Sequence, residues 1–199
     1  MHPAFVEEFK SVDAVIASDV RTAGVDAFAL SLLKVERQAR RFVTFLVFQY
    51  PCFDRPDVPI LRGALAASRS VYFEGFLRGF DAVYPTPIEA FIGAQYGHLR
   101  ARLGEAEGHR NKLFHGQLTE ESLSRAQLLE FVADMRRWCE LLCDAGEREF
   151  GYAGFGSSSF TKSPNLTMSA SFLCNMQSLA DYEAFISQVL RRPKGQQAQ

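Results

Sequence analysis

The sequence lacks the features that mark several protein classes. Its strongest apolar run, from Phe42 to Phe48, is far shorter than the ~20 residues that a membrane-spanning helix needs. The N-terminus MHPAFVEEFK has acidic residues and a proline where a signal peptide has an apolar core. The 22 Lys and Arg nearly balance the 23 Asp and Glu, which argues against a uniformly basic nucleic-acid coat. We therefore expect a soluble cytoplasmic protein without membrane contact.

The cysteines are few and lack the spacing of a metal site. The four cysteines include no Cys-x-x-Cys pair, and no histidine cluster accompanies them. Cys139 and Cys143 are four residues apart in a predicted helix, so they can share one face. We expect free thiols that pack as small apolar groups in a reducing compartment, with neither a metal nor a cofactor.

Apolar and aromatic residues are plentiful, and their period is helical. The chain is 47% hydrophobic with 18 Phe in 199 residues, enough for a substantial core. Residues 26–49 carry apolar positions at steps of three and four, and residues 42–51 are too apolar all round for a surface helix. The predicted inner stripe consists of Phe28, Leu32, Val35, Ala39, Phe42 and Leu46. This helix should lie at the centre of the fold.

Three prolines follow that helix, and further helices are expected after them. One runs from about residue 60 to 80, where Gly75 and Gly79 offer a smooth strip for a close neighbour. Another begins at the cap Thr86 and runs towards Leu103, with a stop at Gly104 or Gly108. The next helix should run from Thr119 to about Phe150, with an inner stripe of Leu128, Val132, Met135, Cys139 and Leu142.

The chain changes character after residue 150. Residues 151–165 are rich in Gly and Ser and predict a loop, and a shorter helix fits residues 178–192, with Ser178 as its cap. We find no internal repeat and no convincing alternating strand pattern. The fold class is therefore all-α, a bundle of four main helices with additional short N- and C-terminal helices. Residues 1–150 form the bundle in this interpretation, and residues 151–199 pack on it, with a disordered tail from about 193.

The segment Arg110-Asn111-Lys112-Leu113-Phe114-His115 concentrates the usable chemistry. It supplies a permanent cation, an amide and an imidazole within about one and a half helical turns. Asn111 and His115 share one helix face, while Arg110 and His115 lie roughly 140° apart, so a helix end or a second copy would have to bring them together. With no serine elbow and no cysteine near His115 in the sequence, the segment suits a phosphodiester better than a carbonyl.

The pattern Arg-Asn-x-x-x-His, formed by Arg110, Asn111 and His115 between two predicted long helices, resembles the motif of the HEPN domains. These are all-α domains named for higher eukaryotes and prokaryotes nucleotide-binding, and the resemblance covers about residues 25–150. It implies a metal-independent endoribonuclease, often a toxin or anti-phage effector, whose homodimer lines one cleft with both motifs. RNA would be the substrate, and an antitoxin or regulatory protein a further partner.

The resemblance also implies a role for each residue. His115 would be the general acid/base at the ribose 2′-hydroxyl or the leaving 5′-oxygen, and Arg110 would hold the scissile phosphate. Asn111 would orient the imidazole or the phosphate. The products would be a 2′,3′-cyclic phosphate and a 5′-hydroxyl. Members paired with a nucleotidyltransferase antitoxin commonly have a Tyr two residues after the His. Here that position is Gln117, which argues against control by that route.

Several positions have two interpretations on sequence alone. Lys112 can contact phosphate or simply be solvated, and Glu74 can support the motif or be an ordinary surface acid. The aromatic residues Tyr152, Phe155 and Phe160 can stack on bases or anchor their loop, and the basic group Arg37, Arg40 and Arg41 can guide RNA or form a solvated face. The alternative to the nuclease is a non-catalytic helical module that binds a nucleotide or a protein.

Overall fold

The computed structural model describes residues 1–68, 71–114, 123–165 and 167–191, with the backbone alone for residues 111–114. In these ranges the chain is helical, and the β-type pairing shown is an isolated antiparallel bridge between Val71 and Arg191. The all-α expectation is confirmed. The chain forms two compact units: unit 1 comprises residues 1–38 and 89–156, and unit 2 comprises residues 39–88 and 157–199. The sequence-based division at residue 150 stays a prediction.

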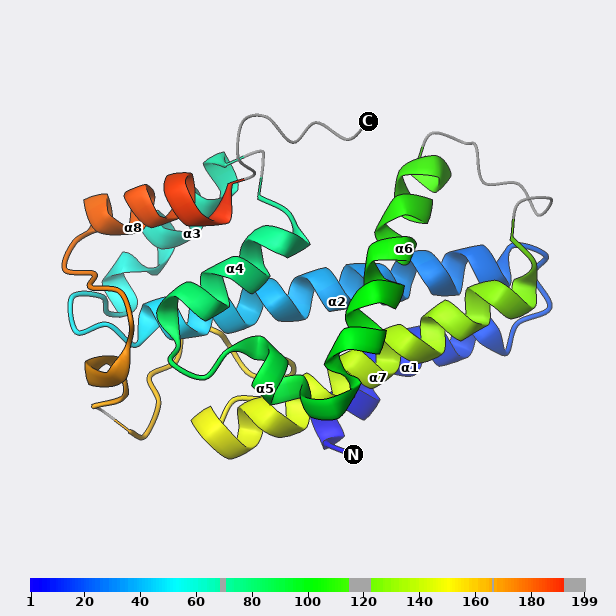
Figure 1. The fold of residues 1–199 in the computed structure, drawn as a ribbon, viewed down its shortest axis with the longest axis horizontal. Helices are drawn as coiled ribbons and strands as arrows, with labels where there is room; N and C mark the ends of the chain where they lie inside the picture. Colours follow the sequence, from blue (N-terminus) through cyan, green and yellow to red (C-terminus); the bar gives the residue numbers. More distant parts are fainter. Residues whose placement is uncertain (69–70, 115–122, 166, 192–199) are drawn as a thin grey trace. The chain divides into compact units, whose positions relative to one another are not determined.

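Unit 1 is built around the long helix α7. Ser124 and Gln127 form a capping box at its start, and Gly151 ends it in the left-handed conformation with φ of 66°. The predicted inner stripe from Leu128 to Leu142 is buried, as expected. The helices of this unit, shown in Figure 1, are α1 (Pro3–Ile16), the first part of α2 (Ala23–Phe48), α5 (Ile88–Ile92), η2 (Gly93–Gln95), α6 (Tyr96–Phe114) and α7 (Arg125–Phe150).

Unit 2 is built around the second part of α2. Residues 42–50 are all buried, which confirms that this apolar end of the helix is central. The Phe42 ring meets the Phe80 ring edge to face, and Phe48 meets Phe160 in the same way. The other elements of unit 2 are η1 (Arg55–Asp57), α3 (Val58–Ala67), α4 (Phe73–Val83), η3 (Met168–Ser171), α8 (Leu179–Phe185) and the π-helical η4 (Ile186–Leu190).

The glycine strip on α4 receives the neighbour that the sequence predicts. A Cβ atom built on Gly75 would overlap the carbonyl oxygen of Leu190, and one built on Gly79 would overlap the Leu190 side chain. Arg78, between them, donates to the carbonyl oxygens of Val189 and Arg191 at 3.3 and 3.0 Å. The two glycines therefore let η4 approach α4 at backbone distance.

The helix expected over residues 60–80 is wrong as a single element. The structure has two helices there, α3 ending at Ala67 and α4 beginning at Phe73. Val71 lies in the bridge to Arg191, and Tyr72 is extended, with φ −121° and ψ 176°. Pairing with a segment distant in sequence thus outweighs the local helical pattern, and residues 69–70 lie outside the described ranges.

The helix expected from Thr86 to Leu103 is also interrupted. Gly93 has φ of 70°, a conformation that ends α5. The short η2 then leads into α6. The expected stop at Gly104 or Gly108 is wrong, because α6 continues through both to Phe114. An interior glycine costs about 1 kcal/mol relative to alanine, which weakens a helix without ending it.

Two other helix boundaries differ from the expectation. Helix α7 begins at Arg125 rather than Thr119, because Ser124 provides the capping box. The C-terminal helix starts as predicted, with Ser178 accepting from the backbone N–H of Asp181 at 3.2 Å, but it becomes π-helical at Ile186 and ends at Leu190. The predicted tail from 193 lies outside the described residues.

The cysteines are free, and two of the aromatic residues after α7 are buried. All four cysteines are free, and Cys139 and Cys143 are buried, whereas Cys52 is exposed. Burial raises the pKa of both buried thiols, that of Cys143 to about 12, so they stay protonated at neutral pH. Tyr152 and Phe155 are buried, which confirms that these rings anchor their loop rather than face a ligand.

Candidate functional site

Helix α6 carries the first part of the predicted motif, and its buried side is narrow. Leu99, Leu103 and Ala106 are buried at steps of four and three residues, and most of the other positions are polar or glycine. A helix with such a stripe gains limited stability from apolar burial. Polar contacts to its neighbours must therefore contribute to its position.

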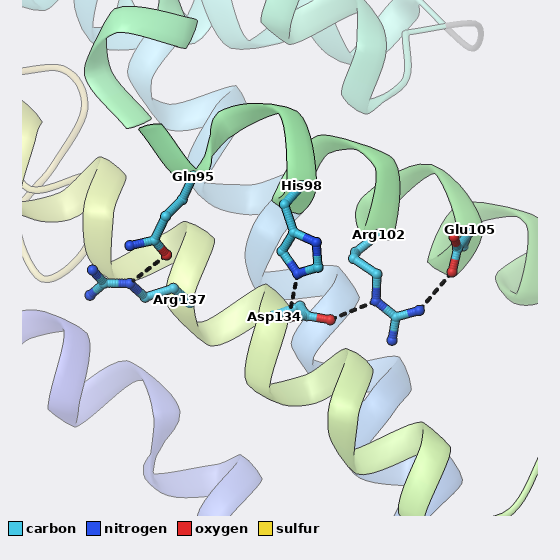
Figure 2. Close-up of polar contacts among 6 residues, drawn as sticks. All are labelled: Gln95, His98, Arg102, Glu105, Asp134 and Arg137. Carbon is cyan, nitrogen blue, oxygen red and sulfur yellow. Dashed lines mark hydrogen bonds and ion pairs between the residues drawn. The ribbon is translucent and has the colours of Figure 1, made fainter. Parts of the chain in front are cut away.

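A polar network joins η2 and α6 to α7, as Figure 2 shows. The Asp134 carboxylate lies between two side chains of α6, with one oxygen 2.7 Å from Arg102 Nε and the other 3.7 Å from His98 Nε2. Arg102 Nη1 also donates to Glu105 at 2.7 Å. One turn further along α7, Arg137 Nε donates to Gln95 Oε1 at 3.1 Å. The network fixes α6 along its first three turns.

Arg102 is the best-held side chain of this network. Its guanidinium carbon lies 3.9 Å from the centroid of the Phe131 ring, and His109 meets the same ring edge to face at 5.4 Å. The hydrogen bond to Asp134 of α7 raises the pKa of Arg102, so the guanidinium stays charged and bound to that helix. One buried ring thus contacts two basic side chains of α6, Arg102 and His109.

Arg110 points to a different neighbour. Its Nη1 group donates to Oε1 of Glu36 on α2, in the same unit. The two side chains are 23% and 26% exposed, so the pair is neither sealed from water nor fully solvated. A guanidinium has five N–H donors, and Glu36 takes one of them in the described part of the chain. The described residues therefore leave further N–H donors of Arg110 for an anion beside Glu36.

The electrostatics of Glu36 are set by burial first and by Arg110 second. Burial raises the pKa of Glu36, while the positive charge of Arg110 acts to lower it. Arg110 therefore opposes the effect of burial on this carboxyl group. Removing Arg110 would leave a desolvated acid that gains a proton more readily.

The other predicted site residues stay predictions. Asn111 and Lys112 lie in the last turn of α6, for which the backbone alone is described, and His115 lies outside the described residues. Glu74 lies on α4 in unit 2, so its predicted support of the motif is not tested. Within the described residues, no three His, Cys, Asp or Glu side chains group as metal ligands do. No described helix is long and apolar enough to cross a membrane.

Glu36 is the residue that sequence reasoning missed. It is 74 residues before Arg110, and no local pattern connects the two positions. The available signal is its place on α2: position 36 follows the buried Val35 and lies four residues after the buried Leu32. An acid at the edge of a buried stripe needs a partner.

Comparison with known proteins gives little guidance. No family model and no solved structure matches the chain. It is 30% identical over 90 residues to a phosphoribosylaminoimidazole carboxylase of Treponema denticola, a match that covers 45% of this chain and 55% of that protein. The chain thus spans about half the length of the curated relative that it matches. The match is too partial to show a family.

Proposed function

We propose that the chain is a metal-independent endoribonuclease of the HEPN type that acts as a homodimer, as a toxin or phage-defence effector. The proposal rests on the pattern Arg110-Asn111-x-x-x-His115 together with one structural observation. The Arg110 guanidinium is partly exposed and donates to a single acceptor among the described residues, Glu36, so it has further N–H groups to offer a phosphate. That the bundle has the four-helix HEPN arrangement is part of the proposal.

The proposed chemistry breaks the bond between phosphorus and the 5′-oxygen while the 2′-oxygen bonds to phosphorus. His115 moves the proton at the 2′-hydroxyl or at the leaving 5′-oxygen, and such a general acid/base contributes about 10²–10⁴ in rate. Arg110 stabilises the added negative charge, worth about 3–4 kcal/mol for a preorganised donor, with Asn111 orienting the reacting groups.

Glu36 acts as a positioning residue in this scheme. It accepts one N–H of Arg110, and this contact fixes the direction in which the remaining N–H groups point. Glu36→Gln keeps a hydrogen-bond acceptor but removes the charge. We expect it to lower kcat more than it raises KM, because the guanidinium is less well placed in the transition state. Glu36→Asp, which keeps the charge, should recover part of the loss.

The test uses the purified full chain, a mixed-sequence RNA and a chelator. Arg110→Ala and His115→Ala should each abolish cleavage without changing the helical circular dichroism. Arg148→Ala is the control, because Arg148 is an exposed arginine of the same unit whose ion pair is with the adjacent Glu149. Mass spectrometry should find 2′,3′-cyclic phosphate ends. Undiminished cleavage by both motif variants would remove the proposal.

A second candidate is a non-catalytic module that binds a nucleotide at Arg110. The partial match to a protein named for a phosphoribosyl compound favours testing such a ligand. This candidate predicts saturable binding of a phosphoribosyl nucleotide by calorimetry, lost in Arg110→Ala, and no cleavage of any RNA by the wild type. Growth arrest on expression that His115→Ala relieves would favour the nuclease instead.

A further inference from the structure

The two units carry opposite net charge. Unit 1 contains 12 Lys and Arg against 17 Asp and Glu, a net charge of −5, although it contains the predicted motif. Unit 2 contains ten Lys and Arg against six Asp and Glu, a net charge of +4. A near-neutral chain therefore hides a basic unit, and such asymmetry is typical of proteins that meet a polyanion.

Two cations of unit 2, Lys162 and Arg62, are held by carbonyl oxygens and an aromatic ring. Lys162 donates to the carbonyl oxygens of Phe48 and Tyr50 at 2.6 and 2.9 Å, at the end of α2. The Arg62 guanidinium lies over the Phe160 ring, 4.9 Å from its centroid, and has no carboxylate partner among the described residues. Carbonyls and rings hold a cation in place without cancelling its unit charge.

Arg41, Arg62 and Lys162 are brought together by one segment, residues 157–162, and we call these three side chains the basic strip. Arg41 on α2 donates to the carbonyl oxygen of Ser157 at the start of the segment. Arg62 on α3 lies over Phe160, and Lys162 ends the segment, 4.9 Å from the centroid of the Phe48 ring. Gln49 donates to the carbonyl oxygen of Thr161 at 3.0 Å and accepts from the Ser163 N–H at 2.7 Å. The segment is thus fixed along the end of α2.

The acids near the strip are largely occupied by the backbone. Asp54 and Asp57, whose charges act on Lys162, form the capping box of η1, and Asp54 accepts from the Arg55 N–H at 2.7 Å. Burial lowers the pKa of Lys162, and these carboxylates act in the opposite direction. Their charge reduces the field at one end of the strip, while Arg41 and Arg62 lie at other points along it.

We propose that the basic strip binds single-stranded RNA, with phosphates on the cations and a base stacked on the Arg62–Phe160 pair. Arg41 and Phe48 are seven residues apart on α2, so the strip spans about 10 Å, room for two or three phosphates of one strand. A guanidinium plane supported from below by a ring offers its outer face to a base. Exposed hydroxyls of Ser157 and Thr161 lie along the same path. The choice of RNA over DNA rests on the proposed function.

Salt dependence and one exposed arginine give the test. The ligand is a fluorescent oligouridine about 12 nucleotides long, fully 2′-O-methylated so that it cannot be cleaved, and binding is followed by anisotropy. Three cations predict that log K falls with log salt with a slope of about −2, at about −0.7 for each phosphate contacted. Arg62→Gln should weaken binding by about three- to tenfold and make the slope about −1.4.

Variants separate the charge of Arg62 from its stacking. Arg62→Lys keeps the charge, so the slope should stay near −2 while affinity falls, because an ammonium offers no plane to a base. Phe160→Leu keeps an apolar group against Phe48 and should also weaken binding at unchanged slope. Arg148→Gln, the exposed arginine of unit 1, should leave both quantities unchanged. Circular dichroism checks that each variant is folded.

The outcomes distinguish this inference from the proposed function. Arg110→Ala should lose cleavage of ordinary RNA, and Arg62→Gln should change the salt slope by the same amount in the Arg110→Ala background as in wild type. If Arg62→Gln bound the oligonucleotide with wild-type affinity and salt slope, the proposed RNA binding by the strip would be wrong, whatever the cleavage assay gives. Binding to phosphatidylcholine vesicles with about one third phosphatidylserine, together with no binding to the oligonucleotide, would also overturn it.

Discussion

Glycine has opposite effects on α4 of unit 2 and on α6 of unit 1. In unit 2, Gly75 and Gly79 are required by a close contact, because a side chain at either position would overlap Leu190. In unit 1, a Cβ on Gly97 or Gly108 of α6 would meet no described atom within 4 Å beyond the adjacent residues and the helix's own backbone. The first pair tightens a helix contact, and the second pair lowers the intrinsic stability of the helix that carries the motif. The same residue type thus permits a close contact on α4 and loosens α6.

Charge follows the same division. In unit 1 the cations pair with carboxylates: Lys34 and Arg37 with Glu8, Arg102 with Asp134, Arg136 with Asp13. In unit 2, Lys162 and Arg78 donate to carbonyl oxygens instead. Ion pairs therefore help to hold the helices of unit 1 together, above all α6, whose apolar stripe is narrow. Unit 2 holds Lys162 and Arg78 by carbonyl oxygens, and ring pairs such as Phe42–Phe80 pack its core.

The largest expected effect is that of Gly75→Ala. The added methyl group would overlap the backbone oxygen of Leu190, so α4 and η4 must separate, and overpacking of this kind costs about 3 kcal/mol. Urea unfolding followed by circular dichroism measures the loss. A change of less than about 0.5 kcal/mol would show that α4 and η4 are not in close contact in solution.

Gly108→Ala is the matched substitution in unit 1, and its sign should be opposite. The methyl group meets open space, and alanine favours a helix over glycine, so stability should rise by about 0.5–1 kcal/mol. A destabilisation would mean that this face of α6 is covered in the protein as it exists in solution. The two alanine variants together therefore test the contrast between the units.

Asp134→Ala probes how far charge holds α6. The substitution removes the hydrogen bond at 2.7 Å and leaves Arg102, whose side chain is 22% exposed, without its main partner. Hydrogen bonds to charged groups contribute about 1–2 kcal/mol, so a loss of that size is expected in urea unfolding. Glu105→Gln is the control: Glu105 is 55% exposed, and its loss should cost under about 0.5 kcal/mol. Equal effects of the two variants would contradict a special role for Asp134.

The sequence predicted the fold where burial alone decides it. The inner stripes of α2 and α7 are correct because a helix between packed neighbours must bury every third or fourth residue. The interruption at Val71 was missed because it depends on pairing with Arg191, 120 residues later. Gly93 was missed for a different reason: its positive φ is required by the turn between α5 and α6, which periodicity does not encode.

The site shows the same limit more sharply. The motif is a local pattern, so the sequence could present Arg110 as a candidate anion ligand. The sequence offers Glu74 as a possible support of the motif, which is not tested, and it gives no sign of the Glu36 that the structure pairs with Arg110. Which acid reaches a given cation depends on how α2 and α6 cross, and no local signal carries that crossing. The role of His115 stays a prediction, since it lies outside the described residues.

The smallest expected effect concerns the pH dependence of the Arg110–Glu36 pair. Because burial raises the pKa of Glu36, the folded chain binds this proton more tightly than the unfolded chain does. Stability associated with Glu36 is therefore complete below the unfolded value of about 4.5 and falls as pH rises towards the folded value. Glu36→Gln, which cannot ionise, should gain thermal stability relative to wild type between about pH 4 and 7, by less than about 1 kcal/mol.

Arg110→Ala supplies the second half of that experiment. Without the positive charge, nothing in the pair opposes burial, so the pKa of Glu36 should rise further and the stability of this variant should fall more steeply with pH than that of wild type. Adding Glu36→Gln to Arg110→Ala should abolish the extra slope. If wild type instead gains stability over Glu36→Gln as pH rises, the ion pair outweighs the cost of burial. Unit 1 would then bind α6 to α2 by charge as firmly as it binds α6 to α7.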